Sequence, residues 1–71
     1  MLANVDLHLR VNPGDDHRNL GLVEVECDGI EVAPHQKIAC HSGGRQVRAH
    51  ITSVSRRGEN VPHVYADAVT G

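Results

Sequence analysis

Residues 4–11 read Asn-Val-Asp-Leu-His-Leu-Arg-Val, an alternation of polar and apolar side chains that predicts a β-strand. Successive side chains of a strand point to opposite faces, so Val5, Leu7 and Leu9 are expected to face a core. The same period of two returns in three later segments, residues 23–28, 47–52 and 63–68. The sequence therefore predicts a sheet with one buried and one outward face.

Two shorter strands are expected at residues 30–33 and 37–41, which brings the predicted number to six. Ser42-Gly43-Gly44 predicts the tip of a hairpin that joins residues 37–41 to residues 46–54. Six short strands separated by turns predict an all-β fold, a small closed or partly open six-stranded β-barrel. Closure is favoured because it removes exposed sheet edges. A single domain is expected to span residues 1–71.

Length and composition exclude several classes of protein. The chain has 71 residues, 39% of them apolar, and no apolar run approaches the roughly 20 residues of a membrane span. Residues 1–10 carry acid and base within the apolar pattern, so no signal peptide is expected and the cytoplasm is the expected location. Cys27 and Cys40 are expected to be free thiols. The net charge of −2 argues weakly against a strongly basic nucleic-acid-binding protein, because local patches of charge matter more than the total.

Charge is distributed unevenly along the chain. Residues 22–31 carry four acids and no base, whereas residues 45–57 carry no acid and four arginines, Arg45, Arg48, Arg56 and Arg57. A guanidinium group matches phosphate oxygens bidentately, so these four predict a basic stripe that binds phosphate or carboxylate groups. Tyr65, expected to point outward, adds one platform for base stacking. The alternative interpretation is that the arginines form ion pairs with the acidic strand or simply make up a solvated face.

Six histidines in a chain of this length raise the question of a metal site. The nearest cluster in sequence is His35, Cys40 and His41, but neighbours on a strand point to opposite faces. There is no C-x-x-C or H-x-x-x-H spacing, so no metal ligand and no cofactor is assigned, and a site assembled in three dimensions stays open. No G-x-S-x-G element is present and Cys27 is expected in the core, so no enzymatic activity is expected.

A series of short segments runs from residue 21 to the end of the chain. They are Gly21-Leu22-Val23-Glu24-Val25, Gly29-Ile30-Glu31-Val32, Gln36-Lys37-Ile38, a long strand at 47–54, Gly58-Glu59-Asn60-Val61 and Ala66-Asp67-Ala68-Val69-Thr70-Gly71. Their order resembles the second domain of the translational GTPases, the β-barrel of elongation factor Tu, initiation factor 2 and their relatives. The family usually has a glycine where this chain has Pro34-His35-Gln36.

The resemblance does not extend to GTP hydrolysis. The chain has no G-x-x-x-x-G-K-[ST] phosphate loop, and Lys37 is its single lysine. In the family this barrel contacts transfer RNA or ribosomal RNA, so the resemblance implies a binding module.

Together these features predict a non-enzymatic binding module for RNA, transfer or ribosomal, or for a protein partner, with no membrane involved. The predicted contact residues are Arg45, Arg48, Arg56, Arg57 and Tyr65. Two alternatives remain open. One is a protein-interaction adaptor or self-associating homo-oligomer that binds no nucleic acid. The other is a metal-binding protein that uses histidine and cysteine.

Overall fold

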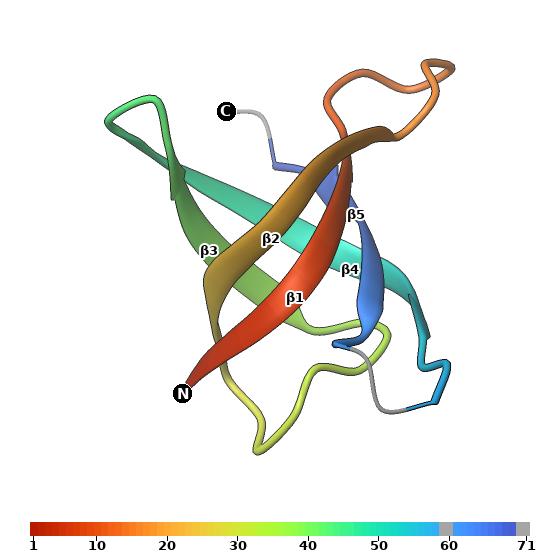
Figure 1. The fold of residues 1–71 in the computed structure, drawn as a ribbon. Coiled ribbons are helices and arrows are strands. Elements are labelled where there is room, and N and C mark those ends of the chain that lie inside the picture. Colours follow the sequence, from red (N-terminus) through yellow and green to blue (C-terminus); the bar gives the residue numbers. More distant parts are fainter. Residues whose placement is uncertain (59–60, 70–71) are drawn as a thin grey trace.

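A computed structural model describes residues 1–58 and 61–69 of the chain. Within these residues there are five strands and no helix, and consequently no helix that could cross a membrane. The strands are β1 (Leu2–Arg10), β2 (Arg18–Cys27), β3 (Lys37–Ser42), β4 (Arg45–Ser55) and β5 (His63–Ala68). They follow one another around a closed barrel, as Figure 1 shows. The prediction of an all-β barrel is therefore confirmed.

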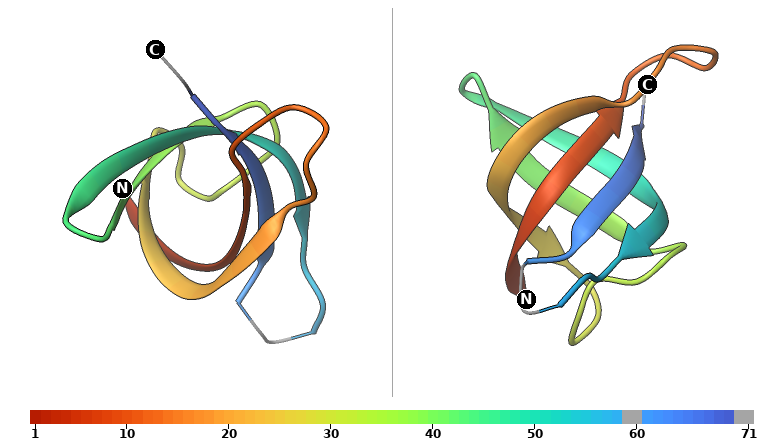
Figure 2. Two further views of the ribbon diagram at one scale, coloured as in Figure 1. Left: turned by 90° about the horizontal axis from the view of Figure 1, so that it is seen from above. Right: turned by 45° about the vertical axis from the view of Figure 1, so that its right-hand side comes forward.

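The pairing of β1 with β5 closes the barrel. Each strand pairs antiparallel with the next in sequence, so five strands leave the first and last running in the same direction, and β1 pairs with β5 in parallel. The pairing runs from Asp6 opposite His63 to Arg10 opposite Asp67. Figure 2 shows the two strands side by side and the ring seen from above. All strands in the described residues are thus hydrogen-bonded on both sides.

Inward-facing side chains of all five strands fill the barrel. Val5 and Leu7 are fully buried and Leu9 is 8% exposed, which confirms the alternation predicted for β1. The remaining buried positions are Val25, Cys27, Val32, Ile38, Cys40, Ala49, Ile51, Val64 and Ala66. This core contains no aromatic ring, and branched aliphatic side chains supply most of its buried apolar surface. Both cysteines lie in it as free thiols, as the sequence predicts.

A β-bulge in β2 interrupts its pairing with β1. The register changes between Leu7, which lies opposite Gly21, and His8, which lies opposite Asn19, so Leu20 is the extra residue. Gly21 has a φ of 76°, in the left-handed region that glycine favours, and its N–H donates to Asn19 Oδ1 at 2.7 Å. A bulge bends its strand and increases the local twist, which helps a five-stranded sheet to close. The bulge also breaks the alternation, so residues 18–22 were not predicted as strand.

The second bulge lies in β4, where the register with β5 shifts between Ile51 and Ser53. Thr52 is the extra residue, and its hydroxyl donates to the carbonyl oxygen of Tyr65 at 3.0 Å. Tyr65 of β5 thus lies next to the bulge in β4 on one side, and on the other side it pairs with His8 of β1, which lies next to the bulge in β2.

The prediction of a sixth strand at residues 30–33 is wrong. Side chains satisfy the backbone of this segment in place of a neighbouring strand: Gln36 Oε1 accepts from the Ala33 N–H at 3.1 Å, and Gln36 Nε2 donates to the Glu31 carbonyl at 3.0 Å. Arg56 donates to the Val32 carbonyl at 2.6 Å. The segment is therefore a loop that inserts Val32 into the core and leaves Ile30 exposed.

We expect Gly21→Ala to lower the free energy of unfolding by about 1 kcal/mol, because an L-residue at positive φ is strained. Urea denaturation measures this change. Leu22→Ala, which truncates an exposed neighbour on the same strand, is the control and should change stability by no more than about 0.5 kcal/mol. Equal stabilities of the two variants would contradict the role of the bulge.

We expect Gln36→Ala to lower the free energy of unfolding by about 1–2 kcal/mol, since it removes both side-chain hydrogen bonds that brace the loop. The matched control is Gln46→Ala, at an exposed position of β4. If thermal and urea unfolding do not separate the two variants, Gln36 does not hold the loop.

Candidate functional site

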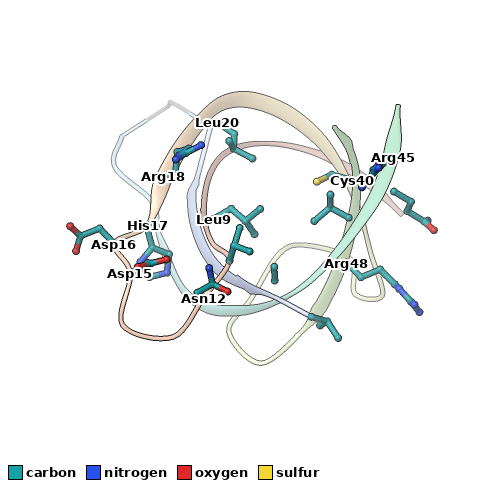
Figure 3. A pocket seen from close by; sticks show the side chains of 15 residues that line it. Leu9, Asn12, Asp15, Asp16, His17, Arg18, Leu20, Cys40, Arg45 and Arg48 are labelled. Carbon is teal, nitrogen blue, oxygen red and sulfur yellow. The ribbon is translucent and has the colours of Figure 1, made fainter. Parts of the chain in front are cut away.

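An open cleft of about 1140 Å³ lies at one end of the barrel. The β3–β4 hairpin and the loop of residues 11–17 extend from this end (Figure 1). Leu9, Leu20, Cys40 and Val47 give the cleft apolar lining, and Figure 3 shows it from close by. Burial raises the pKa of the Cys40 thiol, so the thiol stays protonated at neutral pH and is a poor nucleophile.

Three arginines lie around the mouth of this cleft. Arg18 comes from the start of β2, and Arg45 and Arg48 come from the start of β4. Figure 3 shows Arg18 on one side of the opening and the other two across it. All three are exposed, and none of them pairs with a carboxylate of the described residues. Their guanidinium groups are therefore available to an external anion.

Two acids also line the cleft, Asp15 and Asp16 of the loop before β2. Figure 3 shows Asp16 extending away from the opening. Even counting both, the three arginines leave the lining with an excess of positive charge. Arg48 also lines a smaller hollow of about 460 Å³. Glu26 and Asp28 line the same hollow, but neither forms an ion pair with Arg48.

The structure divides the predicted basic residues between the two ends of β4. Arg45 begins this 11-residue strand and Arg56 follows its last residue, Ser55. Arg56 is held in place by the Val32 carbonyl and lies 3.7 Å from the Glu31 carboxylate, so the alternative of ion pairing applies to it. Arg57 is exposed at the same end. Arg45 and Arg48 line the same cleft as Arg18. Arg18 was not predicted as a contact residue, because it lies outside the basic segment of residues 45–57.

Tyr65 points outward from β5, as expected, but does not line the cleft. The His8 ring stacks on it with a centroid distance of 4.3 Å and an interplanar angle of 15°. His17 meets it edge-on at 5.5 Å. One face of the phenol ring is thus already covered, and Tyr65 belongs to a second polar group on the outside of the barrel.

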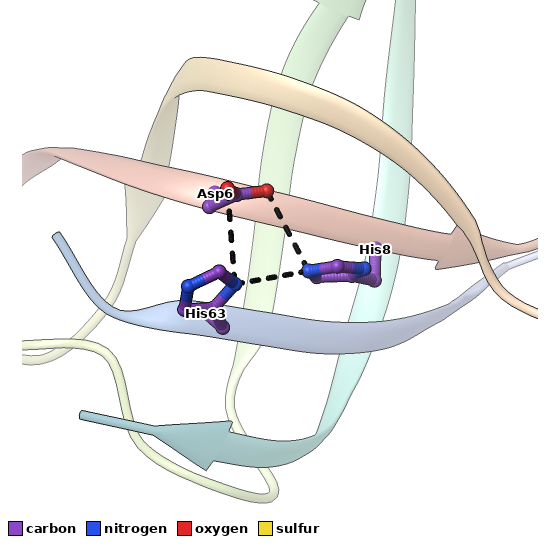
Figure 4. A group of neighbouring side chains, drawn as sticks. All are labelled: Asp6, His8 and His63. Carbon is purple, nitrogen blue, oxygen red and sulfur yellow. Dashed lines mark hydrogen bonds and ion pairs between the residues drawn. The ribbon is translucent and has the colours of Figure 1, made fainter. Parts of the chain in front are cut away.

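That second group lies on the seam between β1 and β5 and contains Asp6, His8 and His63 (Figure 4). This group was not predicted from the sequence, because His8 and His63 are 55 residues apart in the chain. The sequence does contain a hint of it: Asp6 and His8 are both predicted to point outward from the first strand, and His63 to point outward at the start of the last strand. By contrast Cys40 is buried and His41 exposed, so these two do point to opposite faces.

Between this group and the cleft, an ion pair joins Arg10 of β1 to Asp67 of β5. Arg10 donates to both carboxylate oxygens of Asp67, from Nε at 2.9 Å and from the terminal nitrogen at 2.8 Å. His17 Nε2 lies 3.5 Å from the same carboxylate. The hydrogen bonds and charge of Arg10, and to a smaller degree His17, lower the pKa of Asp67.

Comparison with protein-family models, with curated proteins and with solved structures finds no match for this chain.

We expect Asp67→Asn to reduce the loss of stability that the wild type shows in acid. A carboxyl group whose pKa is lowered by folding stabilises the native state above its ordinary value of 3.8, and this stabilisation is lost as the pH falls through the lowered value. Thermal unfolding measured between about pH 5 and pH 2 should show a smaller pH dependence in the variant. Asp28→Asn, at an exposed carboxylate, should retain the wild-type dependence; the same flattening in both variants would contradict the assignment.

Proposed function

We propose that the protein is a non-catalytic binding module that holds the sugar–phosphate backbone of RNA at the cleft end of its barrel. One observation carries the proposal: Arg18, Arg45 and Arg48 gather at one cleft with no carboxylate partner among the described residues. A planar guanidinium group donates in a fork that fits two phosphate oxygens. Three such groups start from two strands whose positions the closed barrel sets relative to each other.

The chemistry of the lining favours contact with the backbone over reading of bases. Phosphate contacts fix the position of a nucleic acid without carrying sequence information. Stacking of bases needs exposed aromatic faces, and the single tyrosine of the chain is stacked on His8. We therefore expect binding that depends on salt and discriminates little between sequences.

The resemblance to the second domain of the translational GTPases is part of this proposal, since that barrel contacts transfer RNA or ribosomal RNA. His35 stands in the turn where the family usually has a glycine, and its φ of 73° lies in the left-handed region that glycine favours. His35 donates its N–H to the Ile51 carbonyl at 2.9 Å, so the turn is tied to β4.

The test is an amide NMR titration of the protein with mixed transfer RNA, repeated over a salt series. Shifts are expected around Arg18 and residues 45–48. Three phosphate contacts predict that log K falls with log salt with a slope of about −2 to −3, because each contact releases condensed counterions. Absence of binding at low salt and high protein concentration would overturn the RNA proposal.

Variants locate the contact. Arg45→Ala combined with Arg48→Ala should weaken binding and reduce the slope by about 1.4–1.8, since two phosphate contacts are lost. The matched control, Arg57→Ala, removes an exposed arginine at the opposite end of β4 and should bind as the wild type does. Equal weakening by the control would show that net charge, and not the cleft, determines binding.

The protein-partner alternative has its own readout. Gel filtration at two ionic strengths detects self-association between the cleft and the acidic residues of β2, which salt should weaken. A dimer that dissociates with salt in a chain that binds no transfer RNA would replace the proposed function.

A further inference from the structure

We propose that Asp6, His8 and His63 form a binding site for one divalent transition-metal ion, with Zn²⁺ as the ion they fit best. The inference is independent of RNA binding, because the three residues lie on the outside of the β1–β5 seam and none of them lines the cleft.

The barrel itself brings the three side chains together. Asp6 and His8 are two residues apart on β1, so both point outward on the same face. His63 lies directly opposite Asp6 in the parallel pairing of β5 with β1. The set therefore forms a triangle on the outer face of two neighbouring strands, and its shape is fixed by register and not by a mobile loop.

The spacing of the ligand atoms matches a coordination sphere. His8 Nε2 lies 3.2 Å from His63 Nδ1 and 3.5 Å from Asp6 Oδ1, and His63 Nδ1 lies 3.7 Å from Asp6 Oδ2. Zinc bonds of about 2.0–2.1 Å in tetrahedral geometry place neighbouring ligand atoms roughly 3.3 Å apart. An ion that sits just above the plane of the triangle, towards its fourth ligand, thus requires only small shifts of the side chains shown in Figure 4.

One polar atom of the set lacks a partner. Asp6 Oδ1 is buried and accepts no hydrogen bond from the described residues, although a buried carboxylate oxygen without a donor is unfavourable. His8 Nε2, at 3.5 Å, is too distant to supply that bond well. A cation between Asp6 and the two imidazole rings supplies the missing interaction.

The donor types indicate which ions bind. Imidazole nitrogen suits Zn²⁺ and its first-row neighbours, whereas Mg²⁺ and Ca²⁺ favour all-oxygen sites. The side chains of Asp6, His8 and His63 are 22%, 15% and 37% exposed, so an ion can reach them from solvent. Three protein ligands leave a fourth position for water or an anionic ligand. Such an ion would also link β1 to β5 and stabilise the closed barrel.

A neighbouring ring restricts the orientation of the His8 side chain. Tyr65 lies opposite His8 in the register and stacks on its ring with a centroid distance of 4.3 Å. Restricting a ligand in its binding orientation strengthens metal binding because less freedom is lost.

The alternative is a metal-free hydrogen bond between the two rings, one nitrogen donating and the other accepting at 3.2 Å. The two arrangements differ in whether His8 Nε2 and His63 Nδ1 bind a metal ion or share a proton. A bound ion requires a lone pair on both His8 Nε2 and His63 Nδ1, whereas the hydrogen bond requires a proton between them. NMR of the ring nitrogens separates these arrangements.

The experiment is a titration of the tag-free protein with Zn²⁺, followed by calorimetry and by ¹⁵N chemical shifts of the histidine rings, with Mg²⁺ as the comparison ion. The expected result is one Zn²⁺ per chain, shifts of His8 Nε2 and His63 Nδ1, a higher melting temperature and no response to Mg²⁺. Absence of binding at about 0.1 mM Zn²⁺, or shifts confined to other histidines, would overturn the proposal.

Substitutions then test each ligand. Asp6→Asn, His8→Gln and His63→Gln should each weaken Zn²⁺ binding by about tenfold or more, since each removes one of three coordinate bonds. The matched control is His41→Gln combined with His50→Gln, which removes two exposed histidines outside the triangle and should leave binding unchanged. Amide spectra of each variant confirm the fold. Binding that survives the three ligand variants, or is lost in the control, would assign the ion elsewhere.

Discussion

The parallel pairing of β1 with β5 is the constraint on which the rest of the structure depends. It buries Val64 and Ala66 completely and gives a partner to what would otherwise be the two open edges of a five-stranded sheet. A core without Phe or Trp has little apolar surface to spare, so leaving the barrel open would expose a large share of it. The same pairing places Asp6 beside His63 and Arg10 beside Asp67, so closure and the outer polar groups depend on one register.

Strand curvature then determines where the remaining features lie. The bulges at Leu20 and Thr52 bend β2 and β4, which curls the sheet far enough for its first and last strands to meet. At one end the β3–β4 hairpin and the loop of residues 11–17 extend beyond the ring (Figure 1). Residues of both segments line the cleft. Because β2 and β4 both begin at this end, Arg18 and Arg45 come to the same opening.

The sequence predicts those features that depend on local pattern. Alternation correctly gives the buried face of β1, and Gly43-Gly44 gives the hairpin tip, where both residues have positive φ. Features that depend on an inserted residue, on particular side-chain bonds to the backbone or on which strands are neighbours were missed. Leu20 breaks the alternation in β2, so the first half of that strand was not recognised, and the side-chain bonds of Gln36 turn an expected strand into a loop. The outward direction of Asp6 and His8 was predictable, but alternation does not reveal which strand lies beside β1.

The barrel closure can be tested directly by NMR in solution, through nuclear Overhauser effects between β1 and β5. The account predicts cross-strand contacts between the backbones of Leu7 and Val64, contacts between the rings of His8 and Tyr65, and slow amide exchange along β5. Absence of these contacts, with amides of β5 exchanging as fast as those of an open loop, would contradict closure and with it the arrangement of Asp6, His8 and His63.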